Sequence, residues 1–239
     1  MKIKRFEDIL IQEDENLLII NKPPMVSSLQ ERIGIAMSVQ ELAQNYYADA
    51  QLCHRLDKET SGILLIAKNA ETYREIAVKF EKRQMDKTYW AIADGRHYFE
   101  KFEVDLPLSV SSKGRAKIDK LNGKPAQTLF QVLEQFKHFS LIESKPITGR
   151  LHQIRIHLAS QNAPIAGDVA YGGQLPFLRT FKKNFNLKKL TEEQPLITRA
   201  ALHAHSLQFE LFGKQYSVDA ALPKDMAAFL NLLRKYDNI

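Results

Sequence analysis

The sequence has 239 residues, of which 44% are hydrophobic and 26% charged, a composition typical of one sizeable globular domain or two small ones. Three observations exclude a membrane protein and an internal disulfide and predict a cytoplasmic protein: no apolar run approaches about 18 residues, residues 1–8 lack a signal-peptide core, and Cys53 is the single cysteine. The formal net charge of +6 favours a polyanionic partner only mildly, so charge alone leaves nucleic-acid binding open.

The N-terminal part predicts a β-hairpin followed by a helix. Two short apolar runs at residues 9–12 and 17–21 flank an acidic turn, and Lys22-Pro23-Pro24 ends the second strand. Ser38-Val39-Gln40-Glu41 has capping-box spacing, which predicts a helix over 38–47.

A buried strand and an amphipathic helix come next. The continuous apolar run after Gly62 predicts a strand over 63–68, and Asn69 is a suitable N-cap for the following helix. On that helix we expect one apolar stripe, formed by Tyr73, Ile76, Ala77 and Phe80.

The remainder of the chain is expected to contain strands near 88–93, 99–106, 126–134 and 139–144, a helix over 151–160, a strand pair near 202–211 and 215–221, and a final helix with Met226, Phe229, Leu230 and Leu233 on one face. The pattern weakens over 173–198, which is interpreted as a surface loop or insertion. Scattered strands interrupted by helices, without repeated βαβ units, predict an α+β fold with a mixed, largely antiparallel central sheet flanked by helices. No linker or repeat divides residues 1–239, so a single domain is expected.

In residues 54–62, His-Arg-Leu-Asp-Lys-Glu-Thr-Ser-Gly, charged side chains are followed by turn-forming residues directly before a predicted buried strand. In extended backbone alternate residues share a face, so Arg55 and Asp57 point the same way. Gly62 can adopt backbone angles that are closed to other residues. The stretch is either an ion pair that caps a turn or part of an active site.

A second segment whose side chains could take part in catalysis, among them arginines and histidines, is Thr148-Gly149-Arg150-Leu151-His152-Gln153-Ile154-Arg155-Ile156-His157-Leu158. If it is helical, Ile154 and Leu158 face the core, and Arg150 lies at or just before the first turn, where it can reach a carboxylate across a cleft. A basic, solvent-exposed helix is the alternative. The pairs Gly167-Asp168 and Tyr171-Gly172 that follow are interpreted as turn signals without chemistry of their own.

Seven histidines raise the question of a metal site, but their spacing does not support one. His152 and His157 are five residues apart and His203 and His205 two apart, whereas a zinc hydrolase places two histidines four apart on a helix with a glutamate. We therefore expect no metal. The ten glycines are dispersed and form no phosphate-binding loop, so no cofactor is expected either. Cys53 is interpreted as a small buried residue.

Four segments resemble the RluA-type pseudouridine synthases, and a weaker match, Leu202-His203-Ala204, follows them. The four are Ile19-Ile20-Asn21-Lys22-Pro23, residues 54–62, Lys87-Thr88-Tyr89-Trp90-Ala91, and residues 148–155 running on to Pro164-Ile165-Ala166-Gly167-Asp168 and Tyr171-Gly172. The second and fourth are specific, and their joint occurrence in this order is hard to obtain by chance. The first departs from the family pattern, because Met25 stands where the family usually has glycine.

The resemblance implies the pseudouridine synthase fold, with an active-site cleft, and an isomerase that needs no cofactor. Such enzymes break the bond from ribose C1′ to uracil N1, turn the base and rejoin it through C5. By resemblance Asp57 is the nucleophile, attacking C1′ or C6, and Arg150 is the candidate cation that keeps it ionised. Tyr89 matches the tyrosine that stacks on the base and carries the C5 proton. Arg55 matches the arginine that enters the stack when the uridine flips out.

Two further RNA contacts are expected, each with an ordinary alternative. Leu202 packs beneath the base or is a core leucine. The segment 181–189 interleaves phenylalanine with Lys182, Lys183, Lys188 and Lys189, as nucleic-acid surfaces do, or is a solvated loop. Other family members carry an N-terminal RNA-binding domain, and because the first motif begins near residue 9, none is expected here.

Taken together, the sequence predicts a monomeric RNA pseudouridine synthase that acts on structured tRNA or rRNA stem-loops, with no membrane partner. Two other classes stay open. One is an RNA-binding protein that has lost activity. The other is a hydrolase of glycosidic bonds, such as a nucleosidase, although that class usually needs paired carboxylates or a metal.

Overall fold

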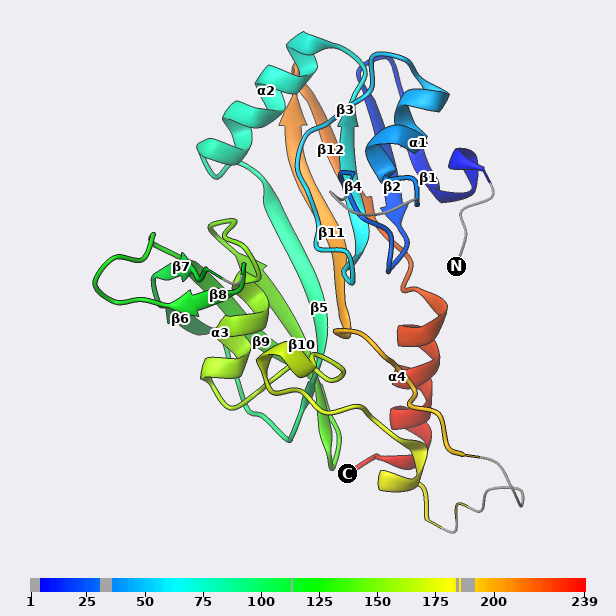
Figure 1. Cartoon of the computed structure of the whole chain (residues 1–239), viewed down its shortest axis with the longest axis vertical. Coiled ribbons are helices and arrows are strands. Elements are labelled where there is room, and N and C mark those ends of the chain that lie inside the picture. Colours follow the sequence, from blue (N-terminus) through cyan, green and yellow to red (C-terminus); the bar gives the residue numbers. More distant parts are fainter. Residues whose placement is uncertain (1–4, 31–35, 113, 184, 186–191) are drawn as a thin grey trace. The chain divides into compact units, whose positions relative to one another are not determined.

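The computed structural model describes residues 5–30, 36–112, 114–183, 185 and 192–239, and the chain falls into two compact units (Figure 1). Unit 1 comprises Met1–Thr88 and His203–Pro223, and unit 2 comprises Tyr89–Leu202 and Lys224–Ile239. Each unit is described by itself below. A single catalytic domain over the whole chain stays a prediction.

Unit 1 is built on a mixed sheet with β4 at its centre. Its strands are β1 (Leu10–Glu13), β2 (Leu17–Lys22), β3 (Gln51–Leu52), β4 (Ser61–Ala67), most of β11 (Leu202–Leu211) and β12 (Lys214–Asp219). β2 runs antiparallel along one edge of β4, while β11 pairs in parallel with the start of β4 and β3 pairs with its end. The predicted hairpin is confirmed as β1–β2, and β2 ends at Lys22 as expected. Every residue of β4 is buried, as the apolar run predicted.

Two helices of unit 1 begin at the predicted caps, but the apolar stripe predicted for the second of them was partly wrong. Ser38 and Glu41 form the capping box of α1 (Val39–Tyr46), and the Asn69 side chain accepts from the Thr72 amide at the start of α2 (Ala70–Glu81). On α2, however, Tyr73 and Ala77 are exposed. The buried residues of α2 are Thr72 and Ile76, because the helix contacts the core along a face narrower than the predicted stripe, and Thr72 lies on that face.

Unit 2 contains a second set of antiparallel strands. They are β5 (Asp86–Asp94, which begins in unit 1), β6 (Phe102–Asp105), β9 (Gln127–Gln135) and β10 (Phe139–Pro146), in the order β5-β10-β9-β6. All four were expected near these positions. A small hairpin, β7 (Leu108–Val110) with β8 (Ala116–Ile118), was not expected. Its strands of three residues are too short to leave a periodic signal.

The helices of unit 2 agree with the sequence pattern. α3 (Gln153–Ser160) buries Ile154 and Leu158, and α4 (Lys224–Tyr236) buries all four of its predicted apolar residues. Two short 3-10 turns complete the unit, η2 (Val169–Tyr171) and η3 (Leu178–Thr180), while η1 (Phe6–Ile9) belongs to unit 1. Among the described strand pairs only β4 with β11 is parallel. The predicted α+β fold with a mixed, largely antiparallel sheet is therefore confirmed.

Within the described ranges, no helix is long and apolar enough to cross a membrane. The same part of the chain holds no group of three or more histidine, cysteine or acidic side chains arranged to bind a metal ion.

Candidate active site

In unit 1, Arg55 and Asp57 lie in a loop, residues 53–60, that joins β3 to β4. The predicted alternation agrees with the exposure of the side chains: Arg55 is exposed, Leu56 is buried and Asp57 is half-buried. The Cys53 amide at the start of the loop donates to the Leu65 carbonyl of β4 at 2.9 Å, whereas side chains and a turn hold the backbone from Leu56 onward.

The Asp57 loop is pinned on both sides of the aspartate. Before it, the Ser28 hydroxyl donates to the Leu56 carbonyl at 2.8 Å and accepts from the Leu56 amide at 3.1 Å. After it, the Met25 amide donates to the Lys58 carbonyl at 2.8 Å, and the Thr60 amide closes a turn onto the Asp57 carbonyl at 3.0 Å. These contacts fix the backbone at Asp57, which is the requirement for a side chain that must meet one atom of a substrate.

A buried lysine completes this clamp. The Lys22 side chain is fully buried, and its ammonium donates to the carbonyl oxygens of Pro23, Val26 and Lys58 at 3.1, 2.8 and 3.2 Å. Burying a charge without hydrogen bonds is costly, and these carbonyl oxygens replace water around the ammonium. Lys22 thereby ties the end of β2 to the Asp57 loop. The sequence motif contained Lys22, but its role in the clamp was missed because Lys58 lies 36 residues away.

Met25 takes the unusual backbone conformation that the family pattern implies. Its φ is +65°, in the left-handed region that glycine adopts without steric cost. The substitution of methionine for the usual glycine therefore keeps the turn but leaves strain in it. The same argument applies to Gly62, where φ is +114° and a Cβ atom would lie 2.1 Å from the Ala204 carbonyl oxygen.

His54 connects the loop to β4 as a neutral side chain. Its Nε2 accepts a hydrogen bond from the Leu65 amide at 3.1 Å. Burial, assisted by the positive charge of Lys87, lowers the pKa of His54 to about 3. At neutral pH the ring is therefore an acceptor that positions the loop. Cys53 was expected to be a small buried residue and is only half-buried, packed against the core of unit 1. Burial of its thiol raises the pKa of Cys53 to about 12, so the thiol is unreactive at neutral pH.

In unit 2, Tyr89 lies on β5 opposite Ser144 of β10, and Leu202 is a buried residue at the first position of β11. Tyr89 is half-buried. The roles of both residues toward a base stay predictions.

Arg150 lies in the loop before α3 and is exposed. Its Nε donates to the Pro125 carbonyl at 3.1 Å, and its amide donates to the Gln153 side-chain oxygen at 3.0 Å. A pairing of Arg150 with Asp57 stays a prediction.

Gln153 holds the loop that carries Arg150, a role that sequence reasoning missed. The same Gln153 oxygen also accepts from the Thr148 hydroxyl at 2.7 Å, while its amide donates to the Gln127 carbonyl and the Thr128 hydroxyl at 2.9 and 3.0 Å. The Gln153 side chain is buried, and its amide group makes four hydrogen bonds, of which the oxygen accepts two and the nitrogen donates two. It fastens the start of α3 to the start of β9.

The helix α3 is not the basic, solvent-exposed helix that was the alternative prediction. Arg155 and His157 are buried with the apolar residues. Arg155 donates two hydrogen bonds to the carboxylate of Asp168, at 2.6 and 2.7 Å, and its guanidinium lies 5.0 Å from the centre of the Tyr171 ring. The Tyr171 hydroxyl is 2.8 Å from His152 Nδ1. Asp168 and Tyr171 were wrongly interpreted as turn signals only, because their partners lie 13 to 19 residues away.

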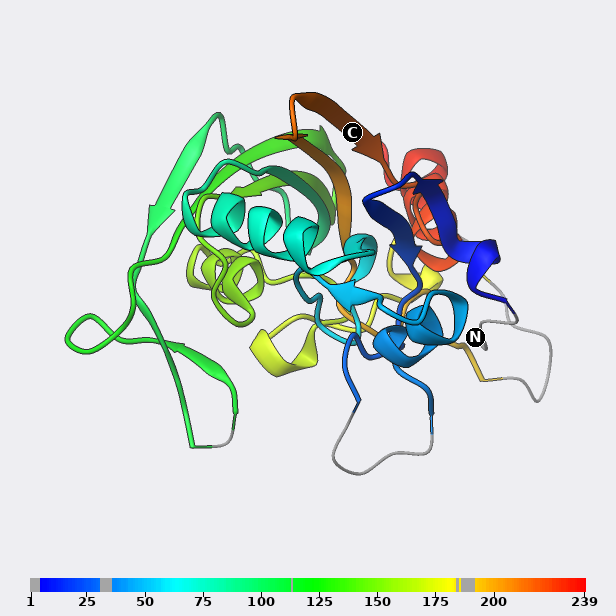
Figure 2. The same cartoon turned by 90° about the horizontal axis from the view of Figure 1, so that it is seen from above.

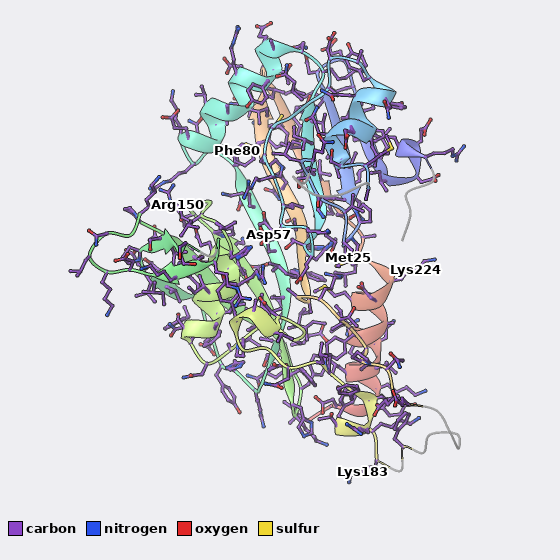
Figure 3. The ribbon with its side chains drawn as sticks, viewed as in Figure 1. Met25, Asp57, Phe80, Arg150, Lys183 and Lys224 are labelled. Atoms are coloured by element: carbon purple, nitrogen blue, oxygen red, sulfur yellow. The ribbon has the colours of Figure 1, made fainter. Side chains whose placement is uncertain are left out.

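The predicted lysine surface is only partly described. Lys188 and Lys189 lie outside the described residues. Lys182 places its ammonium 5.0 Å from the centre of the Tyr236 ring, and Lys183 is exposed. Phe181, however, is buried, with its ring 6.0 Å from that of Phe139, so it belongs to the core and is no platform for RNA bases. Within unit 2, Lys183 and Arg150 lie far apart (Figure 3).

Comparison with known proteins now decides the family. The family profile described as RNA pseudouridylate synthase matches residues 16–160, a range that contains the Asp57 loop, Tyr89 and the α3 segment. The chain belongs to the RNA pseudouridylate synthase family. The predicted resemblance and the predicted enzyme class, an isomerase acting on RNA, are confirmed, and the nucleosidase alternative is not supported.

Individual relatives agree with the family. The ribosomal large subunit pseudouridine synthase C of Pasteurella multocida is 33% identical over 242 residues, which cover 98% of this chain and 70% of the relative. The ribosomal large subunit pseudouridine synthase D of Neisseria meningitidis is 32% identical, with 94% of this chain and 61% of the relative covered. Among solved structures, human RNA pseudouridylate synthase domain containing 4 is 29% identical with a TM-score of 0.73, covering 95% of this chain and 94% of that one.

Proposed function

We propose that this pseudouridine synthase converts specific uridines of large-subunit ribosomal RNA to pseudouridine, with Asp57 as the nucleophile. The choice of RNA is supported by the relatives from Pasteurella multocida and Neisseria meningitidis, which are named for the large ribosomal subunit and align over nearly the whole chain. A tRNA stem-loop is the other substrate expected from the sequence, and the experiment below separates the two.

The observation that carries the assignment of Asp57 is the clamp on its loop. Ser28, Met25 and Lys22 hold the backbone on both sides of the aspartate, so the loop presents its side chain without the entropy loss of ordering a mobile segment. The reaction breaks the bond from ribose C1′ to uracil N1 and rejoins the same base to the same ribose through C5, so it needs no second substrate. A single fixed carboxylate that attacks C1′ or C6 suits this chemistry.

The other predicted residues complete the proposal. Arg55 is exposed next to the fixed aspartate, where its planar guanidinium can replace a flipped base in the RNA stack. Tyr89 receives the base and carries the C5 proton, Leu202 packs beneath the base, and Arg150 stabilises the ionised carboxylate of Asp57. Each of these roles follows from the family resemblance.

Lys182 and Lys183 remain candidates for RNA contacts away from the uridine. Lys183 is exposed, and the ring of Tyr236 beside Lys182 gives that cation a fixed position. The enzyme is further proposed to work as a monomer in the cytoplasm.

The central test replaces Asp57 by Asn, which keeps the shape of the side chain and removes the nucleophile. We expect Asp57→Asn to abolish conversion while RNA affinity and the unfolding midpoint change little. The measurements are pseudouridine formed per RNA and the dissociation constant of the complex. Glu59→Gln removes the same charge two residues away and is the matched control, with turnover near the parent value. Turnover of Asp57→Asn near the parent rate would end the nucleophile assignment.

The role of Arg55 is tested on two substrates. If Arg55 replaces the flipped uridine, Arg55→Ala should slow turnover strongly on a folded stem-loop and much less on an unstructured strand, where little unstacking remains to be offset. An equal loss on both RNAs would indicate electrostatic help for Asp57, and no loss on either would leave Arg55 as a surface residue.

The substrate is tested by mapping. Pseudouridines lost from ribosomal RNA and tRNA when the gene is deleted, and restored by the parent protein but not by Asp57→Asn, identify the target. Loss from tRNA alone would contradict the proposed ribosomal substrate.

A further inference from the structure

Met25 presents an exposed apolar side chain from a strained turn in unit 1. It is the third residue of the turn at 23–26, in which Pro24 stands second. A proline at the second position and a positive φ at the third are features of a type II turn, whose third position suits glycine. Met25 has a φ of +65° there and is 53% exposed. Neither the turn nor burial therefore accounts for the methionine side chain, and strained residues of this kind cluster at active sites and ligand contacts.

The backbone around Met25 is held rigidly to the rest of unit 1. We call residues 23–29 the strap, which leaves the end of β2 (Figure 2). In addition to the bonds from the buried lysine ammonium described above, the strap is joined to the first turn of α1 by two hydrogen bonds, from the Val39 amide to the Ser27 carbonyl at 2.9 Å and from the Gln40 amide to the Ser28 carbonyl at 3.1 Å. A ligand that contacts such a segment does not have to order it, which lowers the entropy cost of binding.

The strap places Met25 beside Asp57. The Ser28 hydroxyl binds the backbone of Leu56, the residue before the aspartate. The Met25 amide donates to the carbonyl of Lys58, the residue after it, at 2.8 Å. All of these residues belong to unit 1, and Met25 and Asp57 lie at the same end of that unit (Figure 3). A nucleotide bound at the Asp57 carboxylate therefore has Met25 as a neighbour.

The chemistry of the Met25 side chain suits one part of an RNA. A thioether is polarisable and makes favourable contacts with aromatic rings, whereas phosphates and ribose hydroxyls are bound by charged or polar groups. In the proposed function the two faces of the target base belong to Tyr89 and Leu202. The aromatic ring left for Met25 is then the base that adjoins the target uridine in the strand. A purine offers this contact a larger face than a pyrimidine.

We propose that Met25 is a specificity-determining residue, whose thioether packs on the base next to the target uridine and favours a purine at that position. This inference rests on the proposed function, because it concerns the RNA that is bound at Asp57. The backbone strain at Met25 is the cost of holding the thioether in this place.

The test uses stem-loops of large-subunit ribosomal RNA in which the bases on either side of the target uridine are purines or pyrimidines. We expect Met25→Ala to lower kcat/KM by about 2- to 10-fold on the purine-flanked RNA, the range of a sulfur–aromatic contact, and by less on the pyrimidine-flanked RNA. Met25→Gly should lose the same preference, because it also lacks the thioether, while Met25→Leu should keep part of it. A loss in Met25→Gly without one in Met25→Ala would overturn the inference, since the backbone and not the side chain would then be responsible.

Phe212 offers a matched control in the same unit. It is also an apolar residue with a positive φ, +51°, and it is 50% exposed. It follows the end of β11, which runs parallel to β4, so it lies at the end of the sheet opposite the Asp57 loop. Phe212→Ala should keep the parent kcat/KM on every RNA. An equal fall in Phe212→Ala and Met25→Ala, or no fall in Met25→Ala, would contradict the contact.

A binding measurement separates this inference from the nucleophile assignment. In the complex of Asp57→Asn with the purine-flanked RNA, peroxide oxidation of Met25, read by peptide mass spectrometry, should slow several-fold. Met37, which is 48% exposed, is the internal reference and should be oxidised at an unchanged rate. Equal protection of the two methionines, or protection of neither, would overturn the inference. Parent-like turnover of Asp57→Asn would instead refute the nucleophile and leave the Met25 contact standing.

Discussion

Breaking the buried ion pair between Arg155 and Asp168 by removing one charge is expected to destabilise unit 2 strongly. Both side chains are nearly inaccessible, with 7% and 1% of their surfaces exposed, and two hydrogen bonds of 2.6 and 2.7 Å join them. The change Asp168→Asn keeps the shape of the side chain and removes its charge. The buried guanidinium of Arg155 then loses its counter-charge, and the packing of the Tyr171 ring does not replace it.

The magnitude follows from the burial of the pair. Removing one partner of a buried pair costs about 3–5 kcal/mol, because a charge is left in a medium that solvates it poorly. For a chain of this length about 1 kcal/mol corresponds to a shift of roughly 2–4 °C, so the midpoint should fall by roughly 6–20 °C. A matched comparison exists in the same unit, where Arg234 and Glu134 also form a bidentate pair but are 47% and 34% exposed. Glu134→Gln should cost about 0–1 kcal/mol.

The assay is equilibrium unfolding in urea together with the thermal midpoint, for the parent, Asp168→Asn and Glu134→Gln. A further variant, Arg155→Met/Asp168→Leu, replaces both charges with apolar side chains and should recover much of the loss, because no buried charge remains. Equal losses below about 1 kcal/mol for Asp168→Asn and Glu134→Gln would refute the reasoning, since burial would then have no effect on the cost of breaking the pair.

Two further predictions concern the loops that carry the candidate catalytic residues. Gln153→Leu removes the acceptor for the Arg150 amide and should lower kcat more than it raises KM. Gln153→Glu keeps that acceptor and should recover part of the rate. Equal rates for the two variants would contradict a positioning role for Gln153. Met25→Gly should stabilise the protein by up to about 1.5 kcal/mol in urea unfolding, because it relieves left-handed strain of about 1–2 kcal/mol at a backbone entropy cost for glycine of about 0.5–1 kcal/mol. A loss of stability would show that the turn is not strained.

The sequence by itself determined much of the local structure and indicated the family, from which the proposed chemistry of the candidate site follows. The capping box at Ser38, the cap at Asn69 and the buried strand after Gly62 were predicted because each depends on residues a few positions apart. The family was also evident from short motifs such as residues 54–62. Such signals are complete within one segment, so no knowledge of the fold is needed to detect them.

Only the tertiary structure decided which polar groups meet. Lys22 reaches the Lys58 carbonyl across 36 residues, and Arg155 meets Asp168 across 13. The sequence gives no periodic signal for such pairs, because their distance depends on how the strands and loops between them fold. The same reason applies to the hairpin of β7 and β8, whose strands are too short to be periodic and whose apolar residues pack on α3. Burial then sets the free-energy cost of breaking such a pair, which is large for an arginine–carboxylate contact inside the protein and small for one on its surface.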